Sequence, residues 1–357
     1  MNKATPQAGQ PALRVDYLSR AELTARPSDW WHSVLGVVPF GASPEFPAAE
    51  DIPLVPVGLT VLGAADSAFE VWQLDEPLRS GRVGHVQYRK GDHVLFGHIS
   101  LAEADPAVAR GDDSARLRQA TARAYAEIFA ALGKLGYPYL FRVWNYLASI
   151  NEDNALGERY RQFNTARREA FLRSERVVEG DVPAASALGS GAGSPLVVYF
   201  LASPARARPL ENPRQLSAYS YPRRYGPDSP IFSRAAIAAA TVGQQLFISG
   251  TASILGHQSV HIGDAGAQAR ESAANISALI DAANEGRAGA RYSVGALKYK
   301  VYVRYASDLA AIQAGFATGL RAEHPITYLQ ADICRRELLV EIEGVGGPDP
   351  GGGAGRA

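Results

Sequence analysis

The sequence predicts an α+β protein with two similar units in one chain, each a β-sheet with helices packed on one face. Strand-like and helical segments alternate along the chain, and each helix is apolar on one side only, which is typical of helices that cover one face of a sheet. The order of segments is the same before and after a break at residues 203–213, where three prolines fall in eleven positions. We therefore expect a first unit at residues 14–203, a second at 214–346 and a flexible tail at 347–357.

The first unit is expected to open with a hairpin. Residues 84–89 and 93–100 both resemble strands, and the turn-prone Lys90-Gly-Asp92 separates them. A long amphipathic helix is predicted over 114–135, followed by a strand over 141–146. A second helix over 158–172 and an apolar strand over 196–201 complete the unit.

The second unit repeats this order. Residues 245–249 form a predicted strand that enters a turn at Gly250, and apolar residues at helical spacing predict a helix over 265–283. Alternation predicts a strand over 297–304, and Asp308 is a good N-cap for a helix that runs to Leu320. The segments 327–334 and 338–343 are expected to be strands joined by a short charged turn.

Composition excludes several classes of function. The 36 basic and 36 acidic side chains give a net charge of +0, so we expect no partner among nucleic acids and no anionic membrane surface. No apolar run approaches the length of a membrane helix, and the N-terminus lacks a secretory signal, so the default expectation is a soluble, cytoplasmic protein. The single cysteine, Cys334, and the scattered histidines indicate neither a disulfide framework nor a metal site.

Two carboxylates near the C-terminus are the first candidate for chemistry. On strand alternation Glu341 and Glu343 share one face of an otherwise apolar strand, and Tyr328 and Cys334 share a face of the preceding one. Burying two adjacent carboxylates raises their affinity for protons, so one of them can stay protonated near neutral pH and act as a general acid. The alternative is that both glutamates lie on a solvent-facing edge strand.

Arginines and tyrosines form a second cluster, which suits a small substrate that carries carboxylates. A guanidinium pairs bidentately with a carboxylate, and a phenol adds neutral hydrogen bonds. The candidate substrate-binding residues lie on the two equivalent predicted strands, in the segment that enters the second unit, and in the strand before the glutamates: Arg142, Arg304, Tyr219, Arg224 and Tyr328. RNA stacking uses similar residue types, but the neutral net charge argues against it.

Several motifs in this order resemble the chorismatase family across about residues 14–345. They are Arg142-Val-Trp-Asn-Tyr146, Glu158-Arg-Tyr-Arg-Gln-Phe163, Ser217-Ala-Tyr-Ser-Tyr-Pro-Arg-Arg-Tyr-Gly226, Phe247-Ile-Ser-Gly-Thr-Ala-Ser253, Tyr328-Leu-Gln-Ala-Asp-Ile-Cys-Arg335 and Leu339-Val-Glu-Ile-Glu343. The last of these is also similar to the RidA/YjgF family, whose fold chorismatases share. The resemblance implies two RidA-like units in one chain.

The resemblance also implies an activity. Chorismatases release pyruvate from chorismate without a metal or organic cofactor, and the subgroups of the family differ in the ring product. The resemblance assigns the catalytic acid to Glu341. It assigns the choice of product to Gly250 and to Cys334, seven residues before that acid. The combination of Gly250 with Cys334 is similar to the type that forms 3-hydroxybenzoate, with some 4-hydroxybenzoate.

Three other functions remain open from the sequence. One is chorismate hydrolysis to pyruvate and a dihydroxycyclohexadiene-carboxylate. Another is a RidA-type imine deaminase, although Pro325-Ile-Thr-Tyr328 lacks the arginine that such sites use. The third is a non-enzymatic protein that binds small aromatic acids. Nothing in the sequence specifies an oligomeric state.

Overall fold

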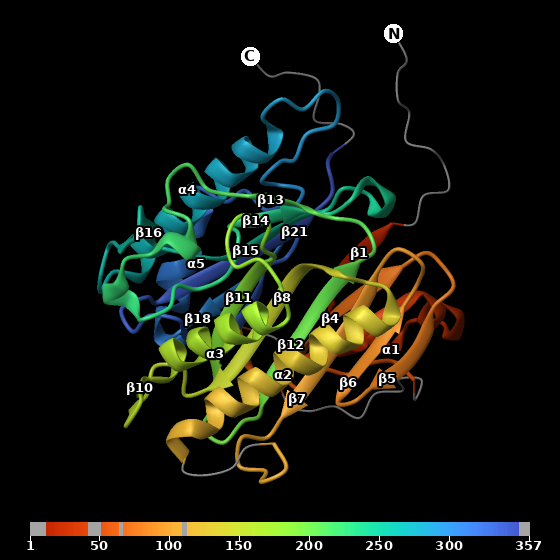
Figure 1. Ribbon diagram of the computed structural model, residues 1–357. Helices are drawn as coiled ribbons and strands as arrows, with labels where there is room; N and C mark the ends of the chain where they lie inside the picture. Colours follow the sequence, from red (N-terminus) through yellow and green to blue (C-terminus); the bar gives the residue numbers. More distant parts are fainter. Residues whose placement is uncertain (1–11, 42–50, 64–66, 109–112, 350–357) are drawn as a thin grey trace.

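The computed structural model describes residues 12–41, 51–63, 67–108 and 113–349. Two seven-stranded sheets and one three-stranded sheet carry the fold, and the longer helices lie over the outer faces of the two large sheets (Figure 1). Within these described ranges, no helix is long and apolar enough to cross a membrane.

The first large sheet belongs mainly to the first half of the chain. Its strands in chain order are β5 (Arg79–Val83), β6 (Val86–Lys90), β7 (Leu95–Leu101), β8 (Tyr139–Ala148), β11 (Ala184–Ser190) and β12 (Leu196–Ser203). Helices α2 (Asp113–Leu135) and α3 (Arg159–Arg173) pack on its outer face. The predicted hairpin, helices and strands of this unit are confirmed. The sequence pattern missed β11, because its small residues (Ala-Ala-Ser-Ala-Leu-Gly-Ser) lack the β-branched and aromatic side chains typical of strands.

The second large sheet has the same construction. Its strands are β13 (Arg208–Leu210), β14 (Ala235–Ile237), β15 (Leu246–Ala252), β18 (Lys298–Val303), β19 (Thr327–Gln330) and β21 (Val340–Gly346). Helices α4 (Ala265–Asn284) and α5 (Leu309–Ala317) cover its outer face. The strand order β13-β14-β15-β21-β18-β19 matches β5-β6-β7-β12-β8-β11 strand for strand, and the parallel pair β18/β19 corresponds to β8/β11. The predicted two-unit α+β architecture is therefore confirmed.

Each large sheet gains its seventh strand from another part of the chain. Strand β20 (Asp332–Ile333) pairs with β11 of the first sheet, whereas β3 (Thr60–Leu62) pairs with β19 of the second. The pairing of β20 with β11 attaches the segment just before β21 to the first sheet.

A third sheet, absent from the predicted elements, lies before the repeated order of elements begins, within the range predicted for the first unit. It has the order β1-β4-β2 and comprises β1 (Leu13–Leu18), β2 (Val34–Gly41) and β4 (Ser67–Leu74). The other short elements include helix α1 (Arg20–Thr24) and the hairpins β9 (Asp153–Asn154)/β10 (Gly157–Glu158) and β16 (Ile254–Leu255)/β17 (Gln258–Ser259). Short 3-10 helices lie at Ser28–Ser33, Ala218–Ser220, Arg223–Tyr225, Ala240–Val242 and Ala306–Asp308.

The structure corrects several expectations for the second half. Residues 327–334 form two strands in different sheets instead of one, although the predicted charged turn follows β20, where the Leu338 amide donates to the Arg335 carbonyl at 3.1 Å. Strand β18 lies between β19 and β21. Gly250 lies inside β15 at a register shift between Ile248 and Thr251, which is a bulge and not a turn. Asp308 is the N-cap residue of α5, as predicted, although its side chain makes no capping hydrogen bond, and α5 ends at Ala317 instead of Leu320. The end of the tail, residues 350–357, lies outside the described residues, whereas the amide of Asp349 donates to the carbonyl of Arg291 at 2.8 Å.

The inner faces of all three sheets share one central core. On β12, Val198 and Phe200 pack against the helices while Tyr199 points inward. On β21, Ile342 packs against the helices, so Glu341 and Glu343 point inward. The fold thus directs both carboxylates into the region between the two units.

Candidate active site

A cavity of about 450 Å³ lies between the two units beside β21. Its wall comes from β15 and β21 of the second unit, from α3 and the β9/β10 hairpin of the first, and from the segments after β20 and before β14. The lining residues used below are Tyr160, Arg224, Tyr225, Arg234, Gly250, Cys334, Arg335, Arg336 and Glu341. A small inner chamber of about 40 Å³ adjoins the cavity at Tyr160, Gly250, Cys334 and Glu341.

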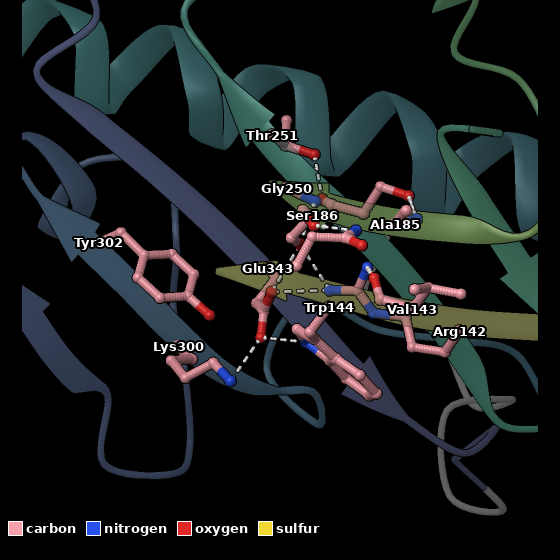
Figure 2. A network of polar contacts seen from close by, with 12 residues as sticks. Arg142, Val143, Trp144, Ala185, Ser186, Gly250, Thr251, Lys300, Tyr302 and Glu343 are labelled. Atoms are coloured by element: carbon pink, nitrogen blue, oxygen red, sulfur yellow. Dashed lines mark hydrogen bonds and ion pairs between the residues drawn. The ribbon is translucent and has the colours of Figure 1, made fainter. Parts of the chain in front are cut away.

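Glu343 is held as a carboxylate by donors from both units (Figure 2). Arg142 Nη2 and Ser186 Oγ donate to its Oε2 at 2.6 and 2.8 Å, while Trp144 Nε1 and Lys300 Nζ approach Oε1 at 2.9 and 2.8 Å. Because all four neighbouring groups donate to this carboxylate, a proton on Glu343 would have no acceptor to which it could bond. Burial alone would raise its pKa, but Lys300 and Arg142 outweigh burial and hold the pKa of Glu343 below its usual range.

Glu341 lies in a different environment although it is only two residues away on the same face. Its side chain is 4% exposed and makes no hydrogen bond or ion pair with the part of the chain that the structure describes. Burial, together with the negative charge of Glu343, raises the pKa of Glu341 to about 8, and Arg142 and Arg234 offset this only in part. One carboxyl of the pair is therefore an acid and the other an anion at neutral pH, which is the arrangement required for general acid catalysis.

Gly250 is the residue that makes room for the acid. A Cβ atom at this position would lie 1.9 Å from Glu341 Oε1 and 3.2 Å from Ser186 Oγ. The Gly250 amide donates to Ser186 Oγ at 3.0 Å, and the same hydroxyl donates to Glu343. The bulge in β15 thus sets the distance between the strand and both glutamates.

Three arginines on the cavity wall have no carboxylate within ion-pair distance among the described residues: Arg224, Arg234 and Arg335. Arg234 Nη2 donates to the Leu216 carbonyl and to Tyr221 Oη at 2.6 and 2.7 Å, and its buried Nε has no partner in the described chain. Arg335 stacks at 4.0 Å on the ring of Tyr225, and its buried Nη2 is likewise without a partner there. By contrast, Arg336 forms an ion pair with Asp153. The unpaired cations make the cavity suited to an anionic ligand.

The structure brings together four of the predicted site residues, namely Glu341, Cys334, Gly250 and Arg224. The other four lie outside the cavity lining, and their roles as substrate contacts stay predictions. Arg142 is engaged by Glu343 and Ser186, and Arg304 is engaged by Asp332 and three backbone carbonyls. Tyr219 and Tyr328 pack against the helix-side cores of the two units.

The Cys334 thiol lies beside the acid at the junction of cavity and inner chamber. Burial and the nearby Glu341 raise the pKa of Cys334 to about 12. The group is therefore a neutral thiol at physiological pH, and it presents a polarizable, weakly hydrogen-bonding surface in place of a nucleophile. Within the described ranges, no group of three His, Cys, Asp or Glu residues is arranged to hold a metal ion.

Sequence reasoning missed several residues that build the site. Arg234 and Arg335 supply the unpaired cations, Ser186 and Lys300 hold Glu343, and Tyr160 lines both the cavity and the chamber. One signal was available, because Arg234 is a single charge within an apolar run at residues 231–240, where a buried charge is costly unless it is paired or hydrogen-bonded.

Comparison with known proteins gives consistent results. The family profile described as "Chorismatase FkbO/Hyg5-like, N-terminal" matches residues 70–202. A chorismatase of Streptomyces rapamycinicus is 37% identical over 96% of this chain and 99% of its own length. A 3-hydroxybenzoate synthase of Streptomyces hygroscopicus is 37% identical over 88% of this chain and 91% of its own. A crystal structure of a chorismatase superposes with a TM-score of 0.80 at 31% identity, covering 94% of this chain and 98% of that one. The chain belongs to the chorismatase family.

Proposed function

We propose that this protein is a chorismatase that cleaves the enolpyruvyl ether of chorismate and releases pyruvate and 3-hydroxybenzoate, with 4-hydroxybenzoate as a minor product. The observation that carries the proposal is the buried Glu341 carboxyl, whose pKa is raised to about 8, in the wall of a cavity where Arg224, Arg234 and Arg335 have no carboxylate partner in the described chain. Chorismate is a dianion, and its enol ether needs a proton donor. The proposed reaction uses no cofactor.

The chemistry begins with a proton transfer to carbon. Glu341 protonates the terminal methylene of the enolpyruvyl group, which leaves an oxocarbenium ion at the ether carbon. Ionised Glu343, fixed by Arg142 and Lys300, keeps the proton on Glu341 until the substrate takes it. The neighbouring C4 hydroxyl of the ring then captures the cation and loses its proton, which gives a cyclic ketal. The bond between ring carbon C4 and its oxygen breaks, and loss of the C3 proton makes the ring aromatic. The oxygen left on the former ether carbon becomes the carbonyl of pyruvate as the C3 oxygen leaves as a phenolate, and the phenolate takes up a proton, so two protons are consumed and two are released.

The atom balance makes water the deciding factor for the product. Hydroxybenzoate and pyruvate together contain the atoms of chorismate, whereas the diene diol and pyruvate require one added water. Gly250 removes side-chain bulk beside Glu341, so the substrate can turn its C4 hydroxyl toward the cation. The neutral Cys334 thiol covers the adjacent wall with a group that holds water weakly. Both features favour intramolecular capture.

Incubation with chorismate, a pyruvate assay and chromatography of the ring products test the proposal. Pyruvate with 3-hydroxybenzoate as the main aromatic product supports it. Pyruvate with the diene diol as the main product would move the protein to the hydrolytic type. A protein that deaminates imines or binds aromatic acids but releases no pyruvate contradicts the proposal.

Replacing Gly250 with alanine is expected to slow pyruvate release and to change the products. The new Cβ would overlap Glu341 Oε1, so the acid must move by about an ångström, which typically costs roughly 10²-fold in rate. The remaining turnover should shift toward the diene diol, because the C4 hydroxyl loses its favourable approach. Steady-state kinetics and product chromatography measure both effects.

Gly191→Ala is the matched control for this substitution. A Cβ at Gly191 would meet only Ser194 Oγ at 3.9 Å, and the residue lies outside the cavity lining. Unchanged rate and products for Gly191→Ala, alongside a large change for Gly250→Ala, locate the effect at Glu341. Similar kinetics for Gly250→Ala and the native protein would contradict the role of this glycine.

Arg335→Ala is expected to weaken chorismate binding. The guanidinium has a buried donor without a partner in the described chain and is held against Tyr225 by contacts to the His257 carbonyl and Ser259 Oγ, both at 3.0 Å. Losing a charge-assisted hydrogen bond of this kind costs about 1.5–3 kcal/mol, so KM should rise more than tenfold. Arg336→Ala should change KM much less, because that exposed guanidinium pairs with Asp153. Equal KM values for the two variants would remove Arg335 from the binding site.

A further inference from the structure

The third sheet sends one charged side chain into the centre of the molecule. Glu70 on β4 is 0% exposed and forms an ion pair with Lys300, which also lies 2.8 Å from Glu343 Oε1. Lys300 therefore links a carboxylate from outside the two duplicated units to the anion beside the acid. The proposed reaction mechanism assigns no task to Glu70.

The donors around Glu70 fix its charge. Trp72 Nε1 and Tyr199 Oη donate to Oε1 at 2.7 and 3.0 Å, and Lys300 Nζ donates to Oε2. Every neighbour is a donor, so the carboxyl has no acceptor to which it could give a proton and is ionised. Arg142, Lys300, Glu70 and Glu343 thus form a buried set of two cations and two anions with no net charge.

We propose that Glu70 is a positioning residue for the reaction: it engages one side of Lys300, so that Glu343 keeps enough negative charge to hold Glu341 in its proton-donating form. The inference rests on the proposed function for its catalytic meaning, but the electrostatic link can be measured without substrate. Without the Glu70 charge, Lys300 would be free to neutralise Glu343, and the buried set would carry one net positive charge near Glu341.

The expected size of the effect follows from strand geometry. Glu341 and Glu343 are two residues apart on β21, roughly 7 Å along the strand. Glu70 lies beyond Glu343, on the other side of Lys300, so its charge lies roughly 10–13 Å from Glu341. A unit charge at that distance and an effective dielectric constant of about 20 shifts a titration by about one pH unit. The other charged or titratable groups that face Glu341 stay unchanged in the test: Tyr302 on β18, Arg142 on β8, Tyr160 on α3, Arg234 before β14, and Cys334 and Arg335 after β20.

Glu70→Gln tests the proposal with two measurements. The alkaline limb of the pH profile of kcat for pyruvate release should move down by about one pH unit. Independently, the difference in unfolding free energy between proteins with and without Glu341→Gln, measured by urea denaturation across pH, reports the titration of Glu341 itself. The upper pH midpoint of this free-energy difference, which is the midpoint for Glu341 in the folded protein, should fall by the same amount in the Glu70→Gln background. If the protein released no pyruvate, the proposed function would fail while this second measurement still tested the role of Glu70.

Tyr199→Phe is the matched control, because it removes contacts to the same carboxylate and the same ammonium without changing any charge. The midpoint should stay at its native value in Tyr199→Phe. In the double variant Glu70→Gln/Lys300→Met, the midpoint should return to the native value or rise above it, because the second substitution restores the charge balance. The double variant also tests the proposal if Glu70→Gln alone does not fold. An unshifted midpoint in Glu70→Gln, an equal shift in Tyr199→Phe, or a lowered midpoint in the double variant would each overturn the proposal.

Discussion

Glu341→Gln is expected to reduce pyruvate release by roughly 10²–10⁴-fold, the usual contribution of a positioned general acid. The amide has nearly the shape of the protonated carboxyl, so the cavity and the contacts of Glu343 should persist. It cannot donate the proton that the enol ether needs. Steady-state assay of pyruvate, with chorismate binding measured separately by calorimetry, should show lost turnover with binding retained.

Glu211→Gln provides the comparison. Glu211 is another carboxyl whose pKa burial raises, but it lies outside the cavity, in a groove near α4. Its charge also acts on Arg234 of the cavity wall, so the comparison is made on kcat and not on KM. Glu211→Gln should leave kcat for pyruvate release near the native value. Near-native turnover in Glu341→Gln, or an equal loss in Glu211→Gln, would show that Glu341 is not the acid.

Glu341→Gln is also expected to change the stability of the protein. The pKa of Glu341 is raised in the folded protein to about 8, from an ordinary value near 4.3 in the unfolded chain. The folded state therefore loses stability as pH rises between these two values, with a slope of about 1.4 kcal/mol per pH unit. Glutamine does not titrate, so Glu341→Gln should be more stable than the native protein, by a margin that grows up to about pH 8 and then levels off. Urea denaturation at several pH values between 5 and 9 measures this margin.

Local patterns in the sequence are sufficient to predict a buried pair of carboxyls on one face of a strand. Alternation along residues 338–343 places Glu341 and Glu343 on one face, and an apolar strand on both sides of them indicates burial. The order of helices and strands likewise reveals the duplication. Alternation cannot specify which strand of the other unit lies opposite the two glutamates. It therefore cannot tell which glutamate is the acid and which is the anion. That assignment depends on Arg142, Ser186 and Lys300, which reach Glu343 but not Glu341.

The arginines illustrate the same limit. Arg142 and Arg304 lie on strands, as predicted or just beyond, but both are buried by contacts with residues distant in sequence. Arg234 and Arg335 line the cavity, and neither has a carboxylate within ion-pair distance among the described residues. Residue type predicts that arginines bind the dianion, whereas only tertiary structure separates arginines that are occupied from those that are free.

Lys300→Met is expected to destabilise the protein by about 3–5 kcal/mol, the usual cost of removing one partner from a buried ion pair. Lys300 is 0% exposed and joins β4, β12, β18 and β21 through Glu70, Tyr199 and Glu343. Methionine fills nearly the same space, so the loss reports charge and not volume. Glu343 would lose this cation, so the pKa of its carboxyl, which Lys300 lowers in the native protein, should rise in the folded state.

The pH dependence and a neighbouring lysine separate this mechanism from a packing defect. In Lys300→Met, the Glu343 carboxyl has a higher pKa in the folded protein than in the unfolded chain, so its ionisation costs stability as the pH rises. The loss of stability in this variant should therefore be largest near pH 8 and shrink toward pH 5. Lys298→Met makes the same change two residues earlier on β18, where the lysine pairs with Asp16 at a partly exposed site. A pair of that kind contributes about 0–1 kcal/mol. Denaturation curves that show equal, pH-independent losses for the two variants would contradict the central role of Lys300. A large loss of stability that occurs only in Lys300→Met and becomes smaller as the pH falls would support this mechanism. It would mean that the Lys300 ammonium, which contacts residues of all three sheets, also keeps Glu343 ionised beside Glu341.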